Sequence, residues 1–357
     1  MKHFLLVLFV LATLFSCKKE EEEKQTKVTS DLNHFKLKGK VQSIEEKSFV
    51  FIGGTIGEPK RENYSEYDYA LTFNEKGQLL SEKKFLSNGM VQEENSYEGL
   101  SKKLFTHQYM NNSLFLSTKY SWDDFGNNII ITRRNPNESQ YDKIVQTFVA
   151  NKIVQKRTFD AQDNLTDKIT YEYDTKGNLI RENYYKNRET VVHSIAYEYD
   201  ANNNKLIETY YTGTDELVSV TKFNYLNNLL INVASFPKGA DVEYAETKMY
   251  DAKGNLTYNK VTDNSVNSEM EEKMNFDTNN NMISSMIYQN GTLIQSVTNS
   301  YYDSNQLIQS SITKQDGTVE TKTYEYEVDA QGNWISKVVF LNKEPQFKIQ
   351  RIIRYYN

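Results

Sequence analysis

The chain offers few residues whose types and spacing could support catalysis. Its four histidines, His3, His34, His107 and His193, are scattered, and no HExxH, GxSxG or Walker motif occurs. A zinc site needs several nitrogen or sulfur ligands close together, and the nucleophile and phosphate motifs need fixed offsets. We therefore expect no enzyme activity, no cofactor and no metal site.

Two segments have the D-x-N-x-N order that opens an EF-hand calcium loop: 200–204 and 277–281. The loop also needs a glycine at position six and a glutamate at position twelve. Lys205 and Tyr211 stand there in the first segment. Aspartates recur in the same way along the chain, whereas a catalytic or metal-binding carboxylate would be singular. The pattern favours turn chemistry, with calcium binding as the alternative.

Tyrosine is unusually frequent, with 26 residues, and several occur as adjacent pairs. Neighbours on a strand point to opposite faces, so one member of each pair faces away from the other. The candidate ligand-stacking residues are Tyr184, Tyr185, Tyr210 and Tyr211. An aromatic row of this kind suits glycan rings or a partner chain. The alternative is β-propensity and packing between neighbouring hairpins.

The only cysteine follows a short export signal. Lys2 precedes an apolar run over 4–14, and Leu14-Phe15-Ser16 leads to Cys17. The run is too short to span a bilayer, which takes roughly 20 apolar residues. The segment resembles a bacterial lipobox, which implies cleavage before Cys17 and lipid attachment to it. The alternative is an ordinary signal peptide with an incidental cysteine.

A charged segment, Lys18 to Lys24, comes directly after this cysteine. Such blocks are solvated and disordered, so we expect a tether. Acidic residues at this place also resemble the surface-export signal of Bacteroidetes lipoproteins. That resemblance implies an outer-membrane protein that is lipid-anchored and faces the cell exterior, whereas a simple spacer is the alternative.

The overall composition excludes one class of partner. The chain has 42 basic and 48 acidic residues and a formal net charge of −6, so no nucleic acid is expected, because its binding needs a basic face. Mean hydropathy is −0.70, low for a globule with one deep core. The composition therefore favours a thin structure.

An internal repeat covers most of the chain. An aromatic or apolar anchor precedes a turn, and successive anchors are 24 to 27 residues apart from Phe73 to Val328. Its copies begin at Phe73, Tyr97, Trp122, Phe148, Tyr173, Tyr199, Phe223, Tyr250, Phe276, Tyr302 and Val328. A fixed period of this length indicates a repeat architecture.

The repeat motif predicts a hairpin turn. In Tyr173-Asp174-Thr175-Lys176-Gly177-Asn178-Leu179, Asp174 suits the first position of a type I turn. Gly177 then takes positive φ and forms a bulge, and Tyr173 and Leu179 become a cross-strand pair. The structural turn residues of the other clear copies are Tyr250, Asp251, Gly254, Asn255, Leu256, Asp329, Gly332 and Asn333. In the Tyr302 copy, a two-residue turn at Ser304-Asn305 would pair Tyr302 with Leu307.

Between anchors lies a second turn, which completes the repeat. Asn88-Gly89, Asn290-Gly291 and Asp316-Gly317 predict two-residue hairpin loops. Each repeat is then two strands of about nine residues, and consecutive hairpins form a meander.

The motif, carried by Tyr173-Asp174 with Gly177-Asn178-Leu179 and by Tyr250-Asp251 with Gly254-Asn255-Leu256, resembles that of the RHS/YD-repeat family. The resemblance covers roughly residues 70 to 357 and implies a coiled sheet, which in large members forms a shell around a toxin. The repeats here are longer, and no toxin domain is evident. The chain looks closer to small repeat-only lipoproteins of Bacteroidetes.

These features predict an all-β fold of tandem antiparallel hairpin repeats. We expect a signal peptide at 1–16, a lipidated cysteine and charged tether at 17–30, and one β-repeat domain at 31–357. Entry strands would occupy 35–72 and repeats 73–357, with about 20 or more strands in one coiled sheet. A curled half-shell or spiral is the preferred shape and two packed sheets are the alternative, with the anchor aromatics on the inner face.

The function that these features favour is non-catalytic. We expect a cell-surface lipoprotein that contacts the membrane through its anchor and binds a glycan or protein ligand through a repetitive Tyr-rich sheet. The alternatives are a structural envelope scaffold and an orphan shell segment of an RHS-type toxin system.

Overall fold

The computed structural model describes residues 30–61, 68–86, 88–186, 189–302 and 306–357. The elements are η1 (Asp31–Asn33), β1 (Val41–Ile52), β2 (Thr55–Pro59), β3 (Asp68–Phe73), β4 (Leu79–Phe85), β5 (Val91–Tyr97), β6 (Lys103–Met110), β7 (Ser113–Trp122), β8 (Asn128–Arg134), β9 (Gln140–Val149), β10 (Lys152–Phe159), β11 (Leu165–Tyr173), β12 (Leu179–Lys186), β13 (Thr190–Tyr199), β14 (Lys205–Thr212), β15 (Glu216–Leu226), β16 (Leu229–Pro237), β17 (Tyr244–Tyr250), β18 (Leu256–Asp263), β19 (Ser268–Phe276), β20 (Met282–Gln289), β21 (Thr292–Tyr301), β22 (Leu307–Lys314), β23 (Val319–Val328), β24 (Trp334–Leu341) and β25 (Glu344–Tyr355).

All 25 strands belong to one sheet, and each pairing within it is antiparallel. From β3 onward each strand pairs with the next strand in the chain, because every connection is a hairpin. The structure confirms an all-β meander of hairpin repeats. The only helix in the described part is the 3-10 turn η1.

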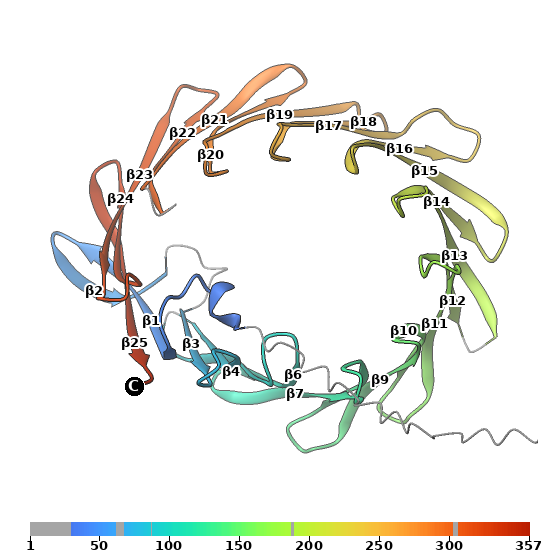
Figure 1. Cartoon of the computed structure of the whole chain (residues 1–357), viewed down its shortest axis with the longest axis horizontal. Coiled ribbons are helices and arrows are strands. Elements are labelled where there is room, and N and C mark those ends of the chain that lie inside the picture. The colour runs from blue at the N-terminus through green and yellow to red at the C-terminus, as the bar shows by residue number, and fades with distance from the viewer. Residues whose placement is uncertain (1–29, 62–67, 87, 187–188, 303–305) are drawn as a thin grey trace, which may run out of the picture.

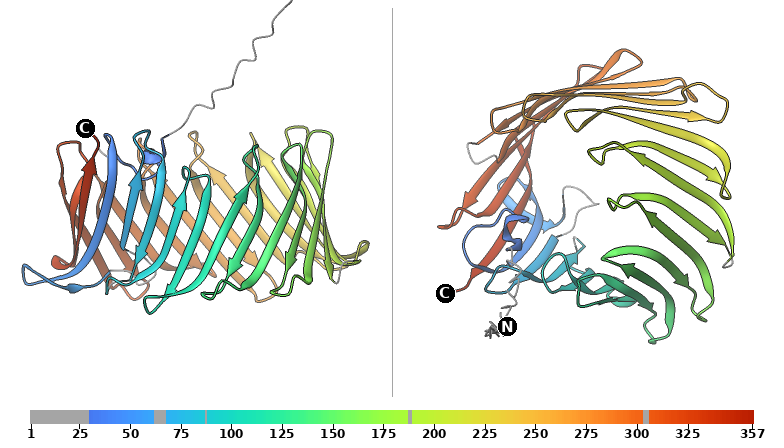
Figure 2. Two further views of the ribbon diagram at one scale, coloured as in Figure 1. Left: turned by 90° about the horizontal axis from the view of Figure 1, so that it is seen from below. Right: turned by 45° about the vertical axis from the view of Figure 1, so that its right-hand side comes forward.

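The sheet closes on itself. β1 pairs with β25 on one side, from Val41 opposite Tyr355 to Val50 opposite Phe347, and with β3 on the other. Since β2 pairs only with β1, 24 of the 25 strands form a closed cylinder (Figures 1 and 2). The expected coiling of the sheet is confirmed, but the sheet continues to full closure and does not stop at the preferred curled half-shell or spiral. The twist of successive strands coils the sheet, and with this number of repeats the two end strands meet.

One edge of the cylinder, here called the anchor edge, carries the repeat turns. Tyr173 lies opposite Leu179, and the Asp174 amide donates to the Asn178 carbonyl over 2.9 Å. The Gly177 amide donates back to the Asp174 carbonyl over 3.0 Å, with Gly177 at φ +91°. This is a three-residue loop closed by a bulge.

Two copies of the repeat have a different register from the one expected. Tyr225, not Phe223, precedes the turn, because Leu226 and Leu229 flank a two-residue Asn227-Asn228 loop with positive φ at both positions. Tyr301, not Tyr302, lies opposite Leu307. Consecutive tyrosines and consecutive asparagines allow two alignments of the motif, and the sequence alone does not choose between them.

At the opposite edge, the turns vary. Asn290-Gly291 is a two-residue loop between the paired residues Gln289 and Thr292. Asp316-Gly317 belongs to a longer loop, since the Lys314 amide donates to the Thr318 carbonyl and the Gly317 amide to the Lys314 carbonyl, both over 2.9 Å. The expected two-residue loop at Asp316-Gly317 was therefore wrong by one residue.

A short segment before β1 crosses the inner side of the cylinder near the anchor edge (Figure 1). Residues 30–40, here called the strap, contact the first repeat through the Asp31 carboxylate, which accepts the amides of Leu79 and Leu100 over 2.8 Å. The strap reaches the last repeat at Asn333, whose side-chain oxygen accepts the Lys38 amide over 2.8 Å. The strap thus spans the pairing between β1 and β25, the first and last strands of the cylinder, which is here called the seam.

The main apolar core lies where the strap covers the wall. Its buried members are Leu32, Leu37, Val41, Ile44, Leu71, Phe73, Leu79 and Tyr97. Most of the remaining wall is a single layer whose side chains are half-buried. The low hydropathy therefore reflects a thin wall with water on both sides.

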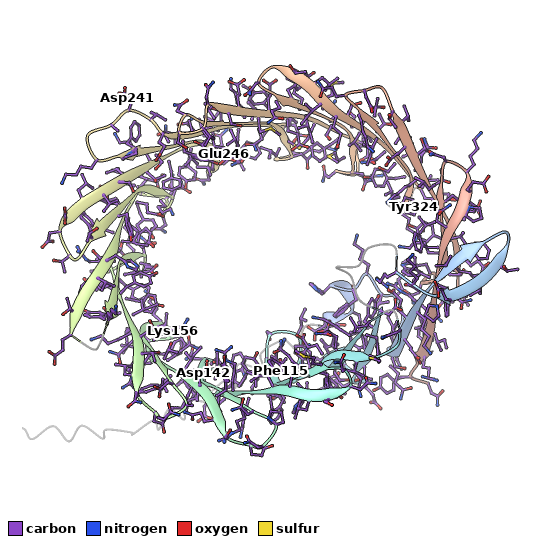
Figure 3. The ribbon with its side chains drawn as sticks, turned by 180° about the vertical axis from the view of Figure 1, so that it is seen from behind. Phe115, Asp142, Lys156, Asp241, Glu246 and Tyr324 are labelled. Carbon is purple, nitrogen blue, oxygen red and sulfur yellow. The ribbon has the colours of Figure 1, made fainter. Side chains whose placement is uncertain are left out.

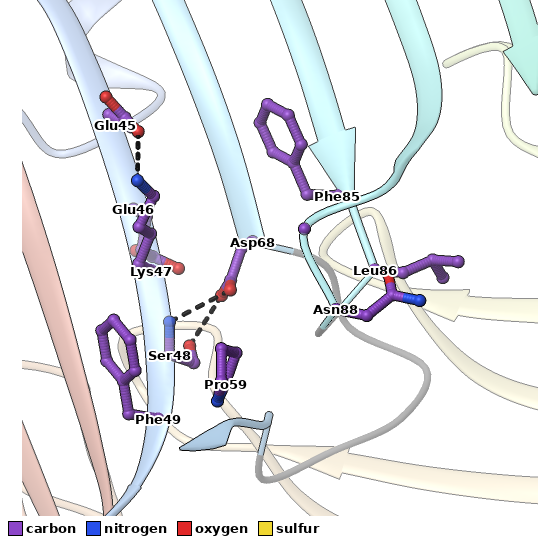
Figure 4. Close-up of a pocket in the computed structure, with 11 residues that line it drawn as sticks. Glu45, Glu46, Lys47, Ser48, Phe49, Pro59, Asp68, Phe85, Leu86 and Asn88 are labelled. Atoms are coloured by element: carbon purple, nitrogen blue, oxygen red, sulfur yellow. Dashed lines mark hydrogen bonds and ion pairs between the residues drawn. The ribbon is translucent and has the colours of Figure 1, made fainter. Parts of the chain in front are cut away.

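Ionic contacts reinforce the seam. The Ser48 amide and hydroxyl donate to the Asp68 carboxylate over 3.0 and 2.7 Å, beside a cavity of about 510 Å³ (Figure 4). Glu46, only 2% exposed, accepts hydrogen bonds from Arg61 over 2.9 Å and from Arg351 over 2.8 Å. These contacts join β1 to both of its neighbours.

Candidate functional site

The two faces of the wall can be assigned from the strand register. Residues directly opposite one another in antiparallel strands share a face, and one such row contains Ile44, Leu71, Glu82, Asn95, Thr106, Thr118, Arg133 and Asp142. The strap packs on Ile44 and Leu71 from inside, so this row faces inward. In Figure 3, Lys156, Glu246 and Tyr324 lie on the same inner side.

The anchor tyrosines occupy the inner face and tie neighbouring repeats together. The Tyr173 hydroxyl donates to the Ile153 carbonyl over 2.8 Å, and Tyr199 does the same to Leu179. Tyr250 and Tyr301 make the equivalent bonds to Leu230 and Met282 over 2.9 and 3.0 Å. Because these hydroxyls are engaged by backbone groups about 20 residues earlier, the anchor tyrosines are structural.

The asparagines of the anchor turns form a second link between repeats. Asn178 donates to the Asn203 side chain over 3.0 Å, and Asn255 donates to Asn280 over 3.1 Å. Asn333 in the last repeat instead bonds the strap, donating to the Lys38 carbonyl over 2.8 Å. Contacts of this kind therefore join several pairs of neighbouring turns along the anchor edge.

The four candidate stacking tyrosines do not form one row. Tyr184 and Tyr210 face inward and are brought together by His193, which lies between them. The ring centroids of Tyr184 and His193 are 4.2 Å apart at 22°, and those of His193 and Tyr210 are 5.5 Å apart at 41°. We call these three residues the inner platform.

Tyr185 and Tyr211 face outward instead. The Lys168 ammonium lies 3.7 Å from the Tyr185 ring centroid, and the Arg181 guanidinium lies 5.6 Å from that of Tyr211. Both rings are thus covered in part by cations. Their faces are less available to a ligand than the sequence pattern suggests.

Glu182, two residues before Tyr184 on β12, supports the inner platform with its carboxylate. Glu182 accepts the Tyr184 hydroxyl over 2.6 Å and the Tyr197 hydroxyl over 2.8 Å. Burial, followed by the hydrogen bond to Glu182, raises the pKa of the Tyr184 phenol well above its usual range. These contacts fix the orientation of the Tyr184 ring.

A hollow of about 690 Å³ lies beside the platform, towards β10 and β11. Tyr184, His193, Ile169 and Lys156 contribute to its lining, together with Asp160 from a turn at the opposite edge. His193 stacks on the Tyr184 ring from β13, and Ile169 of β11 lies directly opposite Tyr184 on the other side, so that all three residues line the hollow. A hollow of this size can hold a small ligand.

The turn aspartates are occupied by the turns themselves. Asp200 accepts the amides of Asn202 and Asn204 on one oxygen and the Asn204 side chain on the other. Asp277 makes the same contacts with Asn279 and Asn281. This arrangement supports the turn interpretation of both D-x-N-x-N segments. Within the described ranges, no three His, Cys, Asp or Glu side chains come together as a metal site.

The predicted lipid-attachment residue Cys17 and its tether lie outside the described residues, apart from Ser30. Ser30 contacts the first anchor turn, where a Cβ added to Gly77 would meet its Oγ at 2.3 Å. No helix in the described part of the chain is long and apolar enough to cross a membrane.

Sequence reasoning missed two members of the site, His193 and Glu182. His193 looked isolated because its partner Tyr184 is on the preceding strand, across the turn between β12 and β13. Counting outward from that turn on both strands would place Tyr184 opposite Val192, and a one-residue register shift between Tyr184 and Tyr185 puts it opposite His193 instead. Glu182 shares the face of Tyr184 two residues away, which the period of a strand does predict.

Comparisons with known proteins give limited matches. A family model described as an uncharacterised protein matches residues 240–355, which is less than half of the chain. A search of curated proteins returns no match. Among solved structures, the TcdB2-TccC3-Cdc42 structure is 11% identical at a TM-score of 0.32, covering 86% of this chain and 20% of that one.

Two other solved structures give matches of similarly low identity and TM-score. The Photorhabdus luminescens Tc holotoxin pore is 11% identical at a TM-score of 0.33, covering 79% of this chain and 19% of that one. A porin-like protein from Bacteroides uniformis is 11% identical at a TM-score of 0.22, covering 89% of this chain and 99% of that one. The chain spans about a fifth of the toxin chains. The fold and site described above therefore rest on the strand pairings and contacts of this chain alone.

Proposed function

We propose that this protein is a cell-surface lipoprotein that binds glycan chains without catalysis, through the inner platform. The observation that carries the proposal is the placement of Tyr184, which Glu182 and His193 hold in a fixed orientation in the lining of a hollow of about 690 Å³. A fixed aromatic face suits the apolar face of a sugar ring, and nearby polar groups suit its hydroxyls.

The anchor is proposed to be lipid attached at Cys17, on the outer membrane and facing the cell exterior. The support is the sequence of the export signal and the acidic tether. The outward face of the wall carries ion pairs such as Lys83–Glu94 and Lys260–Glu269, both 2.9 Å. A wall that faced lipid would be apolar on its outer side, so the lipid and not the wall is the proposed membrane contact.

The test is a glycan array followed by calorimetry with the purified full-length chain. Tyr184→Ala should weaken binding of the glycans found on the array at least tenfold. The matched control is Tyr141→Ala, since Tyr141 is 53% exposed and lies away from the hollow. An array without hits, or a Tyr184→Ala protein with unchanged affinity, would refute the proposal, as would equal effects of the two substitutions.

A scaffold role is the second candidate. It is favoured by the engagement of the anchor tyrosine hydroxyls, such as those of Tyr173 and Tyr250, in contacts between repeats. A glycan array without hits, together with a defined envelope protein crosslinked to the outer wall, would support this role instead.

A further inference from the structure

A large cavity lies at the seam, under the strap. It measures about 1030 Å³ and is separate from the inner platform, because it is bounded by the strap and by β21 to β25. Its aromatic lining is Phe35, Tyr301, Tyr326 and Trp334. The rings of Tyr326 and Trp334 meet edge to face, 6.3 Å apart at 67°.

The charged residues of this lining are all basic. Lys36, Lys38 and Arg351 border the cavity, and no aspartate or glutamate does so among the described residues. Arg351 is already committed, since its guanidinium stacks over Trp334 at 3.3 Å and bonds Glu46 over 2.8 Å. Its position closes off one face of the indole.

The two lysines differ from Arg351. Both belong to exposed parts of the strap, and within the described ranges neither ammonium group makes an ion pair. The strap backbone beneath them is fixed, because the Lys38 amide and carbonyl both bond Asn333. The cavity therefore has two exposed lysines and four aromatic side chains in its lining.

We propose that the seam cavity is a second binding site, which takes an acidic saccharide of the uronic-acid class. Its sugar rings would lie against the edges of Tyr326 and Phe35, and its carboxylates would pair with Lys36 and Lys38. The two neighbouring ammonium groups attract an anion, and added salt weakens this attraction because it screens the charges. The hollow beside the inner platform differs from this cavity, because both lysines and aspartates line it.

The test uses a hexamer of galacturonic acid and its methyl ester, titrated into the purified full-length chain. The acid should bind and the ester should bind at least tenfold more weakly, since esterification removes the charge and leaves the sugar rings. Binding of the acid should weaken as salt is added. This comparison leaves the protein unchanged, so it does not depend on how a variant folds.

A double variant, Lys36→Gln with Lys38→Gln, should weaken the binding of the acid at least tenfold. The matched control is Lys343→Gln, because Lys343 is an exposed turn residue with positive φ, like Lys36, and lies outside the cavity. Equal binding of acid and ester, no binding of the acid, or an unaffected double variant would overturn the proposal. Tyr184→Ala should leave this binding unchanged, so the two sites can fail independently.

Discussion

Glu46 of β1 and Arg351 of β25 lie directly opposite each other, with the Arg351 Nε 2.8 Å from a Glu46 carboxylate oxygen. Their side chains are 3% and 13% exposed. The pair therefore joins the first and last strands of the chain in a place that water barely reaches.

Glu46→Ala should destabilise the closed sheet, because it removes the buried carboxylate that pairs with Arg351, whereas Arg61 keeps Asp68 as a partner. Loss of one partner of a buried ion pair costs about 3–5 kcal/mol. Urea unfolding measures this loss, and small-angle scattering would detect an opened seam. The control is Lys47→Ala, whose partner is Glu45 and whose side chain is 62% exposed. It should change the unfolding free energy by less than about 1 kcal/mol, and equal effects would contradict the role of the seam pair.

Gly177→Val should destabilise the protein, because Gly177 has φ +91° and a β-branched residue resists this conformation. The expected cost is about 1–2 kcal/mol in the free energy of unfolding. Gly177→Asn should cost less, since Asn280 holds the equivalent position with φ +65°. Equal shifts of the denaturation midpoint for the two variants would show that the positive φ is not the cause.

Acid should destabilise the anchor turns. Hydrogen bonds from the Asn255 side chain and amide lower the pKa of the Asp251 carboxyl, and Asn281 does the same for Asp277. A carboxyl whose folded pKa lies below its unfolded value stabilises the fold above the unfolded pKa, and this contribution is lost as pH falls through the folded pKa. The thermal midpoint should therefore fall as the pH drops from about 5 through the lowered folded pKa values of these carboxyls.

The variant that checks this explanation is Asp251→Asn combined with Asp277→Asn. Its midpoint should be lower than wild type at neutral pH and should depend less on pH in the acid range. Asp241→Asn, in an outer loop (Figure 3), is the control and should retain the wild-type dependence. A double variant with an unchanged pH profile would rule out these turns as the origin.

Cys17→Ala should release the protein from the membrane fraction into the soluble fraction, because the anchor is proposed to be lipid at this residue. Mass spectrometry of the wild-type protein should show the added acyl mass, and Lys24→Ala should keep both the mass and the fractionation. Unchanged fractionation of Cys17→Ala, with no acyl mass on the wild type, would exclude lipidation.

The repeat turns made the strand order predictable, since Asp174, Gly177 and Asn178 specify a hairpin through local contacts alone. Closure was not predictable in the same way. It depends on small twist angles added over the whole sheet and on pairing between residues such as Val41 and Tyr355, which no local motif records. The register errors at Phe223 and Tyr302 have a local cause, because neighbouring tyrosines or asparagines offer two equivalent alignments.

The site was predictable only in part. The rule that strand neighbours face opposite sides separates Tyr184 from Tyr185, as the structure has them. It does not say which side is covered by cations, because Lys168 reaches Tyr185 from the neighbouring strand β11 and Arg181 reaches Tyr211 from β12, two strands away. The position of the strap over the last repeats could not be predicted from the sequence either, since it depends on a contact between Lys38 and Asn333, which are far apart in the chain.

Pairing between β1 and β25 has a consequence for how the chain folds. β1 is made first and β25 last, so one edge of β1 has no native neighbour until nearly the whole chain has emerged. An unpaired strand edge is a template for other chains, and contacts this distant in sequence form slowly. We therefore expect folding to be slow and the unfolded chain to aggregate at high concentration. The slow step should be the pairing of β25, in the last hairpin, with β1.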